Sequence, residues 1–389
     1  MDKNRQYKVA LVIRTNGLEY DDRVRKEVLT VQELFPNVKF KIFPMFDDNR
    51  KEEGVSSYGV PYKTVHSPAR DKYAQRTHLI RKSIDFFSSV KKDLKDFDAV
   101  WCGDYHTFMI AALCKNNNLL WDLHELPSML LGNPLKRLFL KYIFSRCKCV
   151  VHANPQRLDY LKSLGVVSNP SKHFALRNYP NFEDVDTEYD EKYHFFVEWK
   201  GDRKCVYLQG LNDDSRAAYE SVKAVLSFPE LVAVVVGNFD RKSKERLQNE
   251  FGAILDERIM FVGKIAQMKI PQYVKQCITS LIFYKNVGPN NWYCEANRFY
   301  QSVIMGLPVV VGNNPSMREL VEEFHFGVSI DDDGGNVTKI EAGIKEVLAH
   351  YDEYKRNNTK YGDNLFWNSQ DGMIKDIIGK WLNINSISL

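Results

Sequence analysis

The chain has 389 residues, 44% of them hydrophobic and 27% charged, a composition that suits an ordinary globular protein and argues against a disordered one. Because a single core stops growing at about 250–300 residues, the length predicts two domains. The 54 basic and 50 acidic residues leave a net charge of +4, which is too balanced for a dedicated nucleic-acid-binding protein.

The cysteines and the amino terminus indicate in which cellular compartment the protein is expected. Seven cysteines are spread along the chain with neither the density of a disulfide framework nor the paired spacing of a metal site. About six apolar residues precede Arg14, too few for a signal peptide or a membrane span. We therefore expect a cytoplasmic protein whose thiols are reduced.

The first half of the chain alternates between strand and helix patterns. A β-branched run is followed by a loop with one glycine, Gly17, and then by a segment with helical periodicity. Strands are expected at residues 7–13, 39–43, 99–102, 119–122 and 149–152, and helices at 21–35, 79–94, 108–114 and 135–144. This alternation predicts a parallel sheet with helices on both faces.

The second half repeats the pattern after a break. A polar, proline-bearing stretch near residues 178–191 interrupts the periodicity and is predicted to be a linker. Strands are then expected at residues 204–208, 232–236, 259–262, 280–283 and 308–311, and helices at 216–226, 270–277, 297–305 and within 339–382. The fold class is therefore α/β, with two Rossmann-like, doubly wound domains expected to face each other across a cleft.

Residues 285–308 carry the most informative chemistry. A polar loop precedes a helix that is expected to begin near Asn297, where free N–H groups attract anions. Lys285 and Arg298 add positive charge close by in the sequence. A strand–helix–strand crossover with a polar loop would give the same pattern without a ligand, and the residues alone leave both interpretations open.

This stretch resembles the donor-site signature of glycosyltransferase family 4. The matching pieces occur in the family's order at residues 283–285, 296–301, 305–308 and 315–319. Further landmarks of the family match at residues 21–27, 122–125, 177–180, 209–216 and 367–368. The order of the pieces, which extend over nearly the whole chain, carries the resemblance more than any single one.

The resemblance implies a GT-B fold and a domain plan. Residues 1–178 would form an acceptor-binding domain, 179–191 a linker, 192–362 a nucleotide-sugar-binding domain, and 363–389 a helix that crosses back toward the first domain. It also implies transfer of a hexose-type sugar from a nucleotide diphosphate, expected to be UDP, with retention of configuration and without a metal or other cofactor. The acceptor would be a surface glycan or its lipid-linked precursor.

The resemblance also assigns roles to three residues. Arg216 and Lys285 would clamp the donor diphosphate, whose negative charge grows as the glycosidic bond breaks. His106 matches the family's N-domain histidine, which contacts the donor sugar near the reacting centre. A solvated surface cation and a structural histidine are the alternatives at these positions.

Other candidate positions follow from the residues themselves as well as from the resemblance, and at the turn with Gly17 the backbone could approach either the donor diphosphate or the acceptor. Donor contacts are expected from Gly17, Gly210, Glu295, Asn297, Arg298 and Gln301. His124 and Glu125 follow a strand end and are interpreted as acceptor-side or structural residues. The family usually has Glu where this chain has Gln301, so ribose binding is expected to weaken or to change nucleotide preference. Glu295 could equally serve to complement a helix dipole.

Two other segments, residues 135–148 and 331–335, have a composition that suggests a binding role. Residues 135–148 mix basic with aromatic and aliphatic residues, as in a helix lying on the inner face of an anionic membrane or in one packed in the core. The acidic residues 331–335 lack the spacing of a calcium loop and are interpreted as a surface turn.

Two other functions remain as alternatives. One is a catalytically silent subunit that binds a partner or polysaccharide, which Gln301 keeps open, and the other is a sugar-nucleotide epimerase. No nucleic-acid partner is expected.

Overall fold

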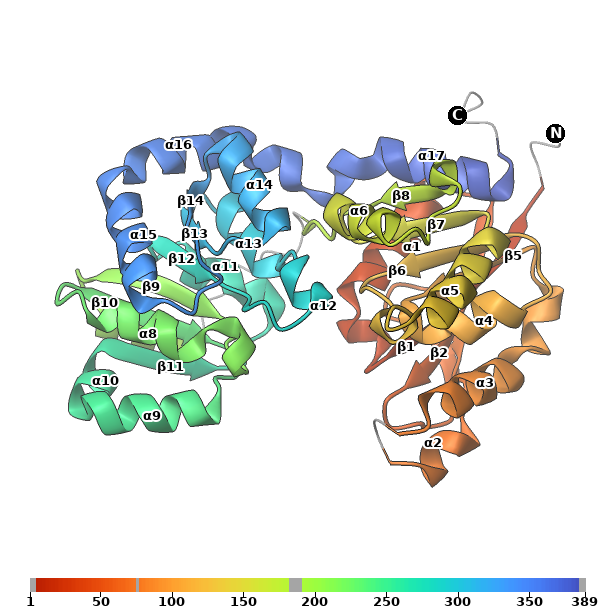
Figure 1. Ribbon diagram of the computed structural model, residues 1–389, viewed down its shortest axis with the longest axis horizontal. Helices are drawn as coiled ribbons and strands as arrows, with labels where there is room; N and C mark the ends of the chain where they lie inside the picture. Colours follow the sequence, from red (N-terminus) through yellow and green to blue (C-terminus); the bar gives the residue numbers. More distant parts are fainter. Residues whose placement is uncertain (1–4, 75–76, 182–190, 385–389) are drawn as a thin grey trace. The chain divides into compact units, whose positions relative to one another are not determined.

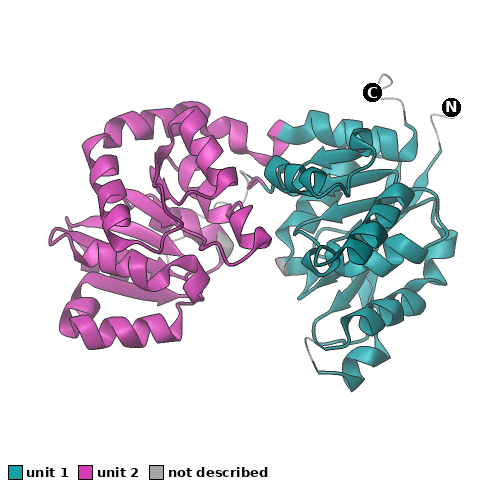
Figure 2. Ribbon diagram, in the orientation of Figure 1, with its two compact units in different colours: residues 1–178, 370–389 teal, residues 179–369 magenta. Residues whose placement is uncertain are grey.

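The computed structural model describes residues 5–74, 77–181 and 191–384 (Figure 1). The chain divides into two compact units, one of residues 1–178 with 370–389 and one of residues 179–369 (Figure 2). Most of the linker expected at residues 179–191 lies outside the described residues. Among the described helices, none combines the length and the apolar character needed to span a membrane.

The first unit is built on an eight-stranded sheet with the order β3-β4-β2-β1-β5-β6-β7-β8. Its strands are β1 (Tyr7–Thr15), β2 (Val38–Phe46), β3 (Glu53–Val55), β4 (Pro61–Lys63), β5 (Ala99–Gly103), β6 (Leu119–Leu123), β7 (Cys149–His152) and β8 (His173–Ala175). Neighbouring strands are parallel except β3 and β4. Every residue of β5, β6 and β7 is buried, so helices must cover both faces of the sheet.

Three helices of the first unit begin where a side chain caps a free N–H group. The side chains of Asp21, Asn133 and Asn154 each accept a hydrogen bond from a backbone N–H of the helix that follows. The three capped helices are α1 (Asp22–Leu34), α5 (Pro134–Arg146) and α6 (Pro155–Ser163), and between α1 and α5 lie α2 (Pro68–Lys72), α3 (Leu79–Val90) and α4 (Phe108–Leu113). The helices α3, α4 and α5 pack in sequence, α4 touching both of the others.

The last helix of the chain, α17 (Asp371–Leu382), belongs to the first unit and packs against α1 and β7 (Figure 1). Its Trp381 is fully buried, meets the ring of Trp101 edge-on at 5.7 Å, and donates from Nε1 to the carbonyl oxygen of Asn118 at 3.0 Å. Burial of an indole whose N–H has a partner holds this helix on the sheet.

The second unit has a six-stranded parallel sheet with the order β11-β10-β9-β12-β13-β14. Its strands are β9 (Lys204–Gln209), β10 (Leu231–Val236), β11 (Ile259–Gly263), β12 (Thr279–Ile282), β13 (Val309–Val311) and β14 (Gly327–Ser329). Alternate residues of β9 enter different cores, Val206 and Leu208 on one face and Cys205 and Tyr207 on the other. The sheet is therefore doubly wound, as predicted.

The helices of the second unit are α7 (Glu191–Lys200), α8 (Ala218–Leu226), α9 (Arg241–Phe251), α10 (Ala253–Arg258), α11 (Ile270–Val274), α12 (Pro289–Trp292), α13 (Asn297–Ile304), α14 (Pro315–Phe324), α15 (Val337–Ala349) and α16 (Tyr351–Tyr361). The helical region expected within residues 339–382 is thus divided among α15, α16 and α17. The division between the two units falls inside it, between residues 369 and 370.

Candidate functional site

The loops that follow β9 and β12 form the centre of the candidate donor site in the second unit. The two strands are hydrogen-bonded neighbours and run parallel, so their carboxyl ends open on the same edge of the sheet. The backbone N–H of Lys285, after β12, donates to the carbonyl oxygen of Ser215, after β9, at 2.8 Å. This bond places Arg216 and Lys285 on adjoining loops, as their expected shared role requires.

The ammonium of Lys285 is held by two carboxylates. Its Nζ lies 3.0 Å from Oδ1 of Asp214 and 3.0 Å from Oε1 of Glu220, with 17% of the side chain exposed. Burial opposes the charge, but the hydrogen bonds and the negative charge of the two carboxylates raise the pKa of Lys285 above its ordinary value. Lys285 is therefore a fixed cation at this edge.

Two arginines approach one aromatic ring. The guanidinium carbon of Arg216 lies 4.1 Å from the ring centre of Tyr284 and that of Arg298 lies 5.1 Å from it. Arg216 also donates to the Tyr284 hydroxyl. Neither guanidinium forms an ion pair with a carboxylate of the described residues, although Arg298 is only 5% exposed and burial lowers its pKa. Positive charge buried in this way is suited to an anionic ligand.

Gly210 allows Arg298 to reach this position. The residue has φ +66°, and a Cβ built on it would lie 2.8 Å from Nη1 of Arg298. The same nitrogen lies 3.4 Å from the Gly210 carbonyl oxygen. The glycine expected to bind the donor therefore acts by making room for a cation.

A Gly210→Ala variant is expected to lose about 1–2 kcal/mol of unfolding free energy from the left-handed backbone alone. It is also expected to weaken UDP binding, because the added methyl group displaces Arg298. Urea unfolding and calorimetry measure the two effects. Gly263→Ala is the matched control, since Gly263 has φ +74° and nothing lies within 4 Å of a Cβ built on it. Equal UDP affinity in both variants would contradict the role given to Gly210.

The start of α13 brings together the remaining donor candidates. No side chain caps this helix, whose first residue is Asn297, and within its first turn the backbone N–H of Phe299 donates to the carbonyl oxygen of Ala296 at 2.9 Å. Gln301 lies one turn after Arg298 on the same face, and its buried Oε1 accepts no hydrogen bond from the described residues. Glu295 accepts a hydrogen bond from the hydroxyl of Tyr300, which favours the structural interpretation of this carboxylate.

The donor site includes a loop that the sequence did not assign to it. Residues 331–335 were expected to form a surface turn, but Oδ2 of Asp333 accepts a hydrogen bond from the backbone N–H of Asn286 at 2.8 Å. A Cβ on the buried Gly334 would lie 2.4 Å from Cβ of Phe283. Asp331 and Gly335 are exposed, as expected of a surface turn, and the turn also packs on the loop that carries Lys285. Tyr284, the platform of the two arginines, was likewise given no role of its own.

In the first unit, His106 follows β5 and is oriented by Asp104. Nδ1 of His106 lies 3.1 Å from Oδ2 of Asp104, a residue with φ +58° and ψ 169°, a conformation that side chains other than glycine rarely adopt. The indole of Trp121 fixes the strained residue by donating to its carbonyl oxygen at 3.1 Å. Burial acts to raise the pKa of Asp104, but the hydrogen bond with His106 and the charge of His124 keep it below its usual range.

His106 lines a cavity of about 520 Å³ where β1, β2 and β5 end. The lining residues are Arg14, Met45, Arg70, Leu79, Lys82, Ser83, Phe86, Tyr105 and His106. Three other predicted residues of this unit, Gly17, His124 and Glu125, are not among them. The backbone N–H of Gly17 lies 3.4 Å from the Thr15 hydroxyl, and Glu125 is exposed.

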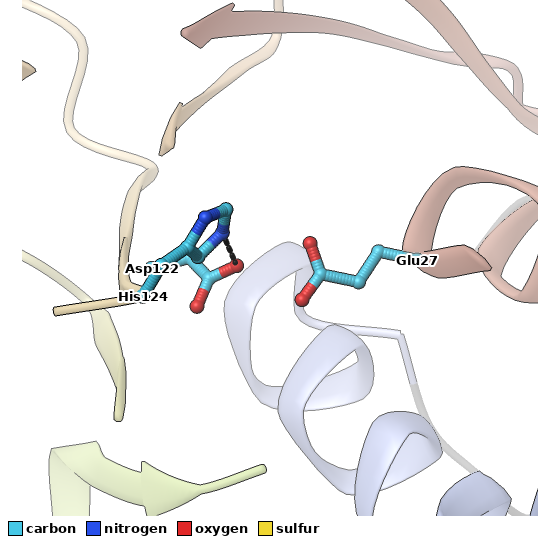
Figure 3. Close-up of side chains that lie close together, drawn as sticks. All are labelled: Glu27, Asp122 and His124. Carbon is cyan, nitrogen blue, oxygen red and sulfur yellow. Dashed lines mark hydrogen bonds and ion pairs between the residues drawn. The ribbon is translucent and has the colours of Figure 1, made fainter. Parts of the chain in front are cut away.

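His124 belongs to a buried charge cluster between α1 and the end of β6, part of which Figure 3 shows. Its Nε2 lies 3.1 Å from Oδ2 of Asp122. Arg23 lies 3.1 Å from the other oxygen of Asp122 and 2.8 Å from Oε1 of Glu27. Burial opposes protonation of His124, but Asp122 raises its pKa to about 9. The pKa of Glu27 is raised to about 8, first by burial and then by Asp122.

The same cluster has the ligand types of a metal site. One atom each of Glu27, Asp122 and His124 lie within 4.8 Å of one another. The guanidinium of Arg23, however, already touches both carboxylates, and a metal ion would have to share the space with this buried positive charge. We therefore interpret the cluster as an ion-pair network, and the absence of a metal from the mechanism stays a prediction.

The network predicts a loss of stability at alkaline pH. Both His124 and Glu27 bind a proton more tightly in the folded chain, so their contributions are complete below their ordinary pKa values, 6.5 and 4.5, and are lost as the pH rises through about 9 and 8. The free energy of unfolding should therefore fall between pH 6.5 and 9, which urea titrations at the two values measure. A His124→Asn variant should show a shallower fall, and an unchanged fall in this variant would contradict the network.

The first unit has a mostly parallel sheet and the second a parallel one, a two-domain plan that corresponds to the GT-B fold, and comparison with solved structures gives the same result. The chain resembles sucrose-phosphate synthase from Thermosynechococcus elongatus with a TM-score of 0.74 at 15% identity, over 98% of this chain and 100% of the other. It resembles Anabaena HepE in complex with UDP-glucose with a TM-score of 0.70 at 12% identity, over 96% of this chain and 100% of the other. It resembles the trehalose 6-phosphate synthase of Burkholderia multivorans with a TM-score of 0.70 at 13% identity, over 97% of this chain and 99% of the other.

These likenesses concern the fold. No protein-family model and no curated protein sequence matches the chain.

Proposed function

We propose that the chain is a glycosyltransferase of the family 4 type that transfers a sugar from a nucleotide diphosphate, with UDP as the expected nucleotide. The observation that carries the proposal is the pair of guanidiniums, Arg216 and Arg298, gathered on Tyr284 without a carboxylate partner among the described residues. Lys285 adds a third cation on the adjoining loop. The solved complexes of HepE with UDP and UDP-glucose support this choice of donor.

The chemistry follows from where charge develops. As the glycosidic bond breaks, negative charge grows on the departing diphosphate, and the preorganised cations Arg216 and Lys285 stabilise it without a metal ion. Asp214 and Glu220, which hold Lys285 when no ligand is bound, would give up part of that contact to phosphate oxygens. Oε1 of Gln301, which is buried and accepts no hydrogen bond from the described residues, would receive one from a ribose hydroxyl. His106, oriented by Asp104, would contact the transferred sugar, with retention of its configuration.

A donor screen tests the proposal. The chain is incubated with UDP-, GDP- and dTDP-sugars and with lipid-linked or soluble glycan acceptors, and products are identified by mass spectrometry. We expect sugar transfer with release of the nucleotide diphosphate, and no transfer by an Arg216→Ala variant. Binding of a nucleotide without transfer to any acceptor would favour the silent subunit, and conversion of one nucleotide sugar into another without an acceptor would favour the epimerase.

We further propose that the acceptor is a surface glycan or its lipid-linked precursor, met at the inner face of the membrane. The helix α5 buries Leu140, Ile143 and Phe144 in the core, yet Leu135 is 79% and Leu138 64% exposed on the same helix. Neighbouring helices add further exposed apolar and basic residues, namely Ile80, Ile84, Lys91 and Lys92 on or next to α3 and Leu113 and Lys115 on or next to α4. Exposed apolar and basic residues of this kind suit contact with an anionic lipid surface.

Vesicle flotation tests the membrane contact. The chain should float with vesicles of phosphatidylglycerol and phosphatidylcholine but not with phosphatidylcholine alone, because the basic residues need anionic headgroups. A Leu135→Ser, Leu138→Ser double variant should lose most of the binding. Ile254→Ser, at a residue 49% exposed in the second unit, is the control. No lipid-dependent flotation of the parent chain would remove this part of the proposal.

A further inference from the structure

Three cationic side chains line the cavity beside His106, and their ion pairs involve a single carboxylate among the described residues. Its three cations come from different elements, Arg14 from β1, Arg70 from α2 and Lys82 from α3. Nη2 of Arg14 lies 2.8 Å and Nη2 of Arg70 3.3 Å from the same oxygen of Asp47. One carboxylate thus serves two guanidiniums.

Lys82 has no such partner. Its Nζ donates to the carbonyl oxygen of Ala74 at 2.7 Å, and it forms no ion pair within the part of the chain that the structure describes. Burial lowers the pKa of Lys82, and the charges of Arg70 and Arg14 lower it further, as expected for cations that face one another. A bound anion would relieve this repulsion.

The cations are held in place before any ligand arrives. Arg70 is 11% exposed and donates to two backbone carbonyl oxygens, those of Phe46 at 3.0 Å and Asp47 at 2.9 Å. Beneath the cations, the buried side chains of Met45 and Phe86 form an apolar floor. Fixed guanidiniums above a surface that excludes water suit phosphate oxygens, which accept several charge-assisted hydrogen bonds at once.

We propose that this cavity binds a phosphate ester carried by the acceptor, with Arg14, Arg70 and Lys82 as the phosphate ligands. The inference rests on the proposed function, which it makes more specific: the acceptor is an anion, and its phosphate lies in the same cavity as His106. A soluble sugar phosphate and a lipid-linked phosphate offer the same group to these cations.

Calorimetry on the full chain compares glucose 6-phosphate with glucose, and a short-chain prenyl phosphate with the prenyl alcohol. At least one phosphate should bind about tenfold or more tightly than its neutral counterpart. Lys82→Gln and Arg70→Lys should each remove most of that difference. Lys39→Gln takes the same charge from an exposed residue near the opposite, amino end of β2 and should leave binding unchanged. The preferred phosphate identifies the source of the anion.

UDP titrations on the same variants separate this inference from the proposed function. If UDP binds normally while neither phosphate exceeds its neutral counterpart, the phosphate site is wrong and the donor site stands. If Lys82→Gln weakens UDP instead of the phosphates, the cavity serves the donor, and the inference is equally overturned. If the phosphates bind as expected but no nucleotide diphosphate does, the cavity is an anion site and the proposed function fails.

Discussion

An Asp122→Asn variant is expected to lose about 3–5 kcal/mol of unfolding free energy, the cost of removing one partner from a buried ion pair. The Asp122 carboxylate is fully buried and touches both Arg23 and His124. An amide of the same shape would leave the buried guanidinium of Arg23 with less than one carboxylate, because Glu27 is itself held partly protonated by burial, and it would remove the charge that keeps His124 protonated.

Urea unfolding, with hydrogen exchange of peptides from β5, β6 and β7 to localise the change, measures the loss. Asp159→Asn in the same unit is the matched control, because Asp159 pairs with Lys162 on the surface of α6 and such pairs contribute at most about 1 kcal/mol. A loss in Asp122→Asn no greater than in the control would mean that the cluster does not hold the charges described for it.

A Lys285→Ala variant is expected to bind UDP more weakly by about 1.5–3 kcal/mol, the usual contribution of a hydrogen bond to a charged group. Two effects act in the same direction. The variant loses a cation that would contact the diphosphate, and it leaves the carboxylates of Asp214 and Glu220 facing the same space, where they repel phosphate.

The control for this variant is Lys223→Ala, which removes a lysine paired with Glu250 at the outer side of α8. Its UDP affinity should equal that of the parent chain. Equal affinities in Lys285→Ala and Lys223→Ala would take Lys285 out of the donor site, and a loss in both would point to a general effect on the second unit.

The fold was predictable because its central strands consist of continuous runs of apolar residues. Residues 9–13 and 232–236 are buried on both faces, and their hydrophobic pattern marks them as strands of a parallel sheet. Short strands at the edges of the sheet, or next to an edge, carry little such signal. β3, β4 and β8 have three residues each, and β4 contains a proline, so their pairing depends on the sheet already being formed.

The candidate site was predictable only at residues that match the sequence landmarks of glycosyltransferase family 4. Arg216, Lys285 and Arg298 match family landmarks, and the structure brings them to one sheet edge. Their partners follow no local pattern. Glu220 reaches Lys285 from α8, 65 positions earlier in the chain, which a single sequence does not show.

The first unit gives a similar contrast. His106 was expected near a strand end and lies there, but the strained backbone of Asp104, which orients it, leaves no mark in composition or spacing. Arg14, Arg70 and Lys82 come from three separate elements, and only folding gathers them around one cavity. Sites assembled in this way need the tertiary structure.

The most direct test of the account is a calorimetric titration of the full chain with UDP, GDP, dTDP and, as a control without phosphate, uridine. The donor site predicts that at least one nucleoside diphosphate binds, that uridine binds far more weakly, and that Arg216→Ala abolishes most of the difference. No binding of any of the three diphosphates would contradict the proposal that this sheet edge is a nucleotide-sugar site.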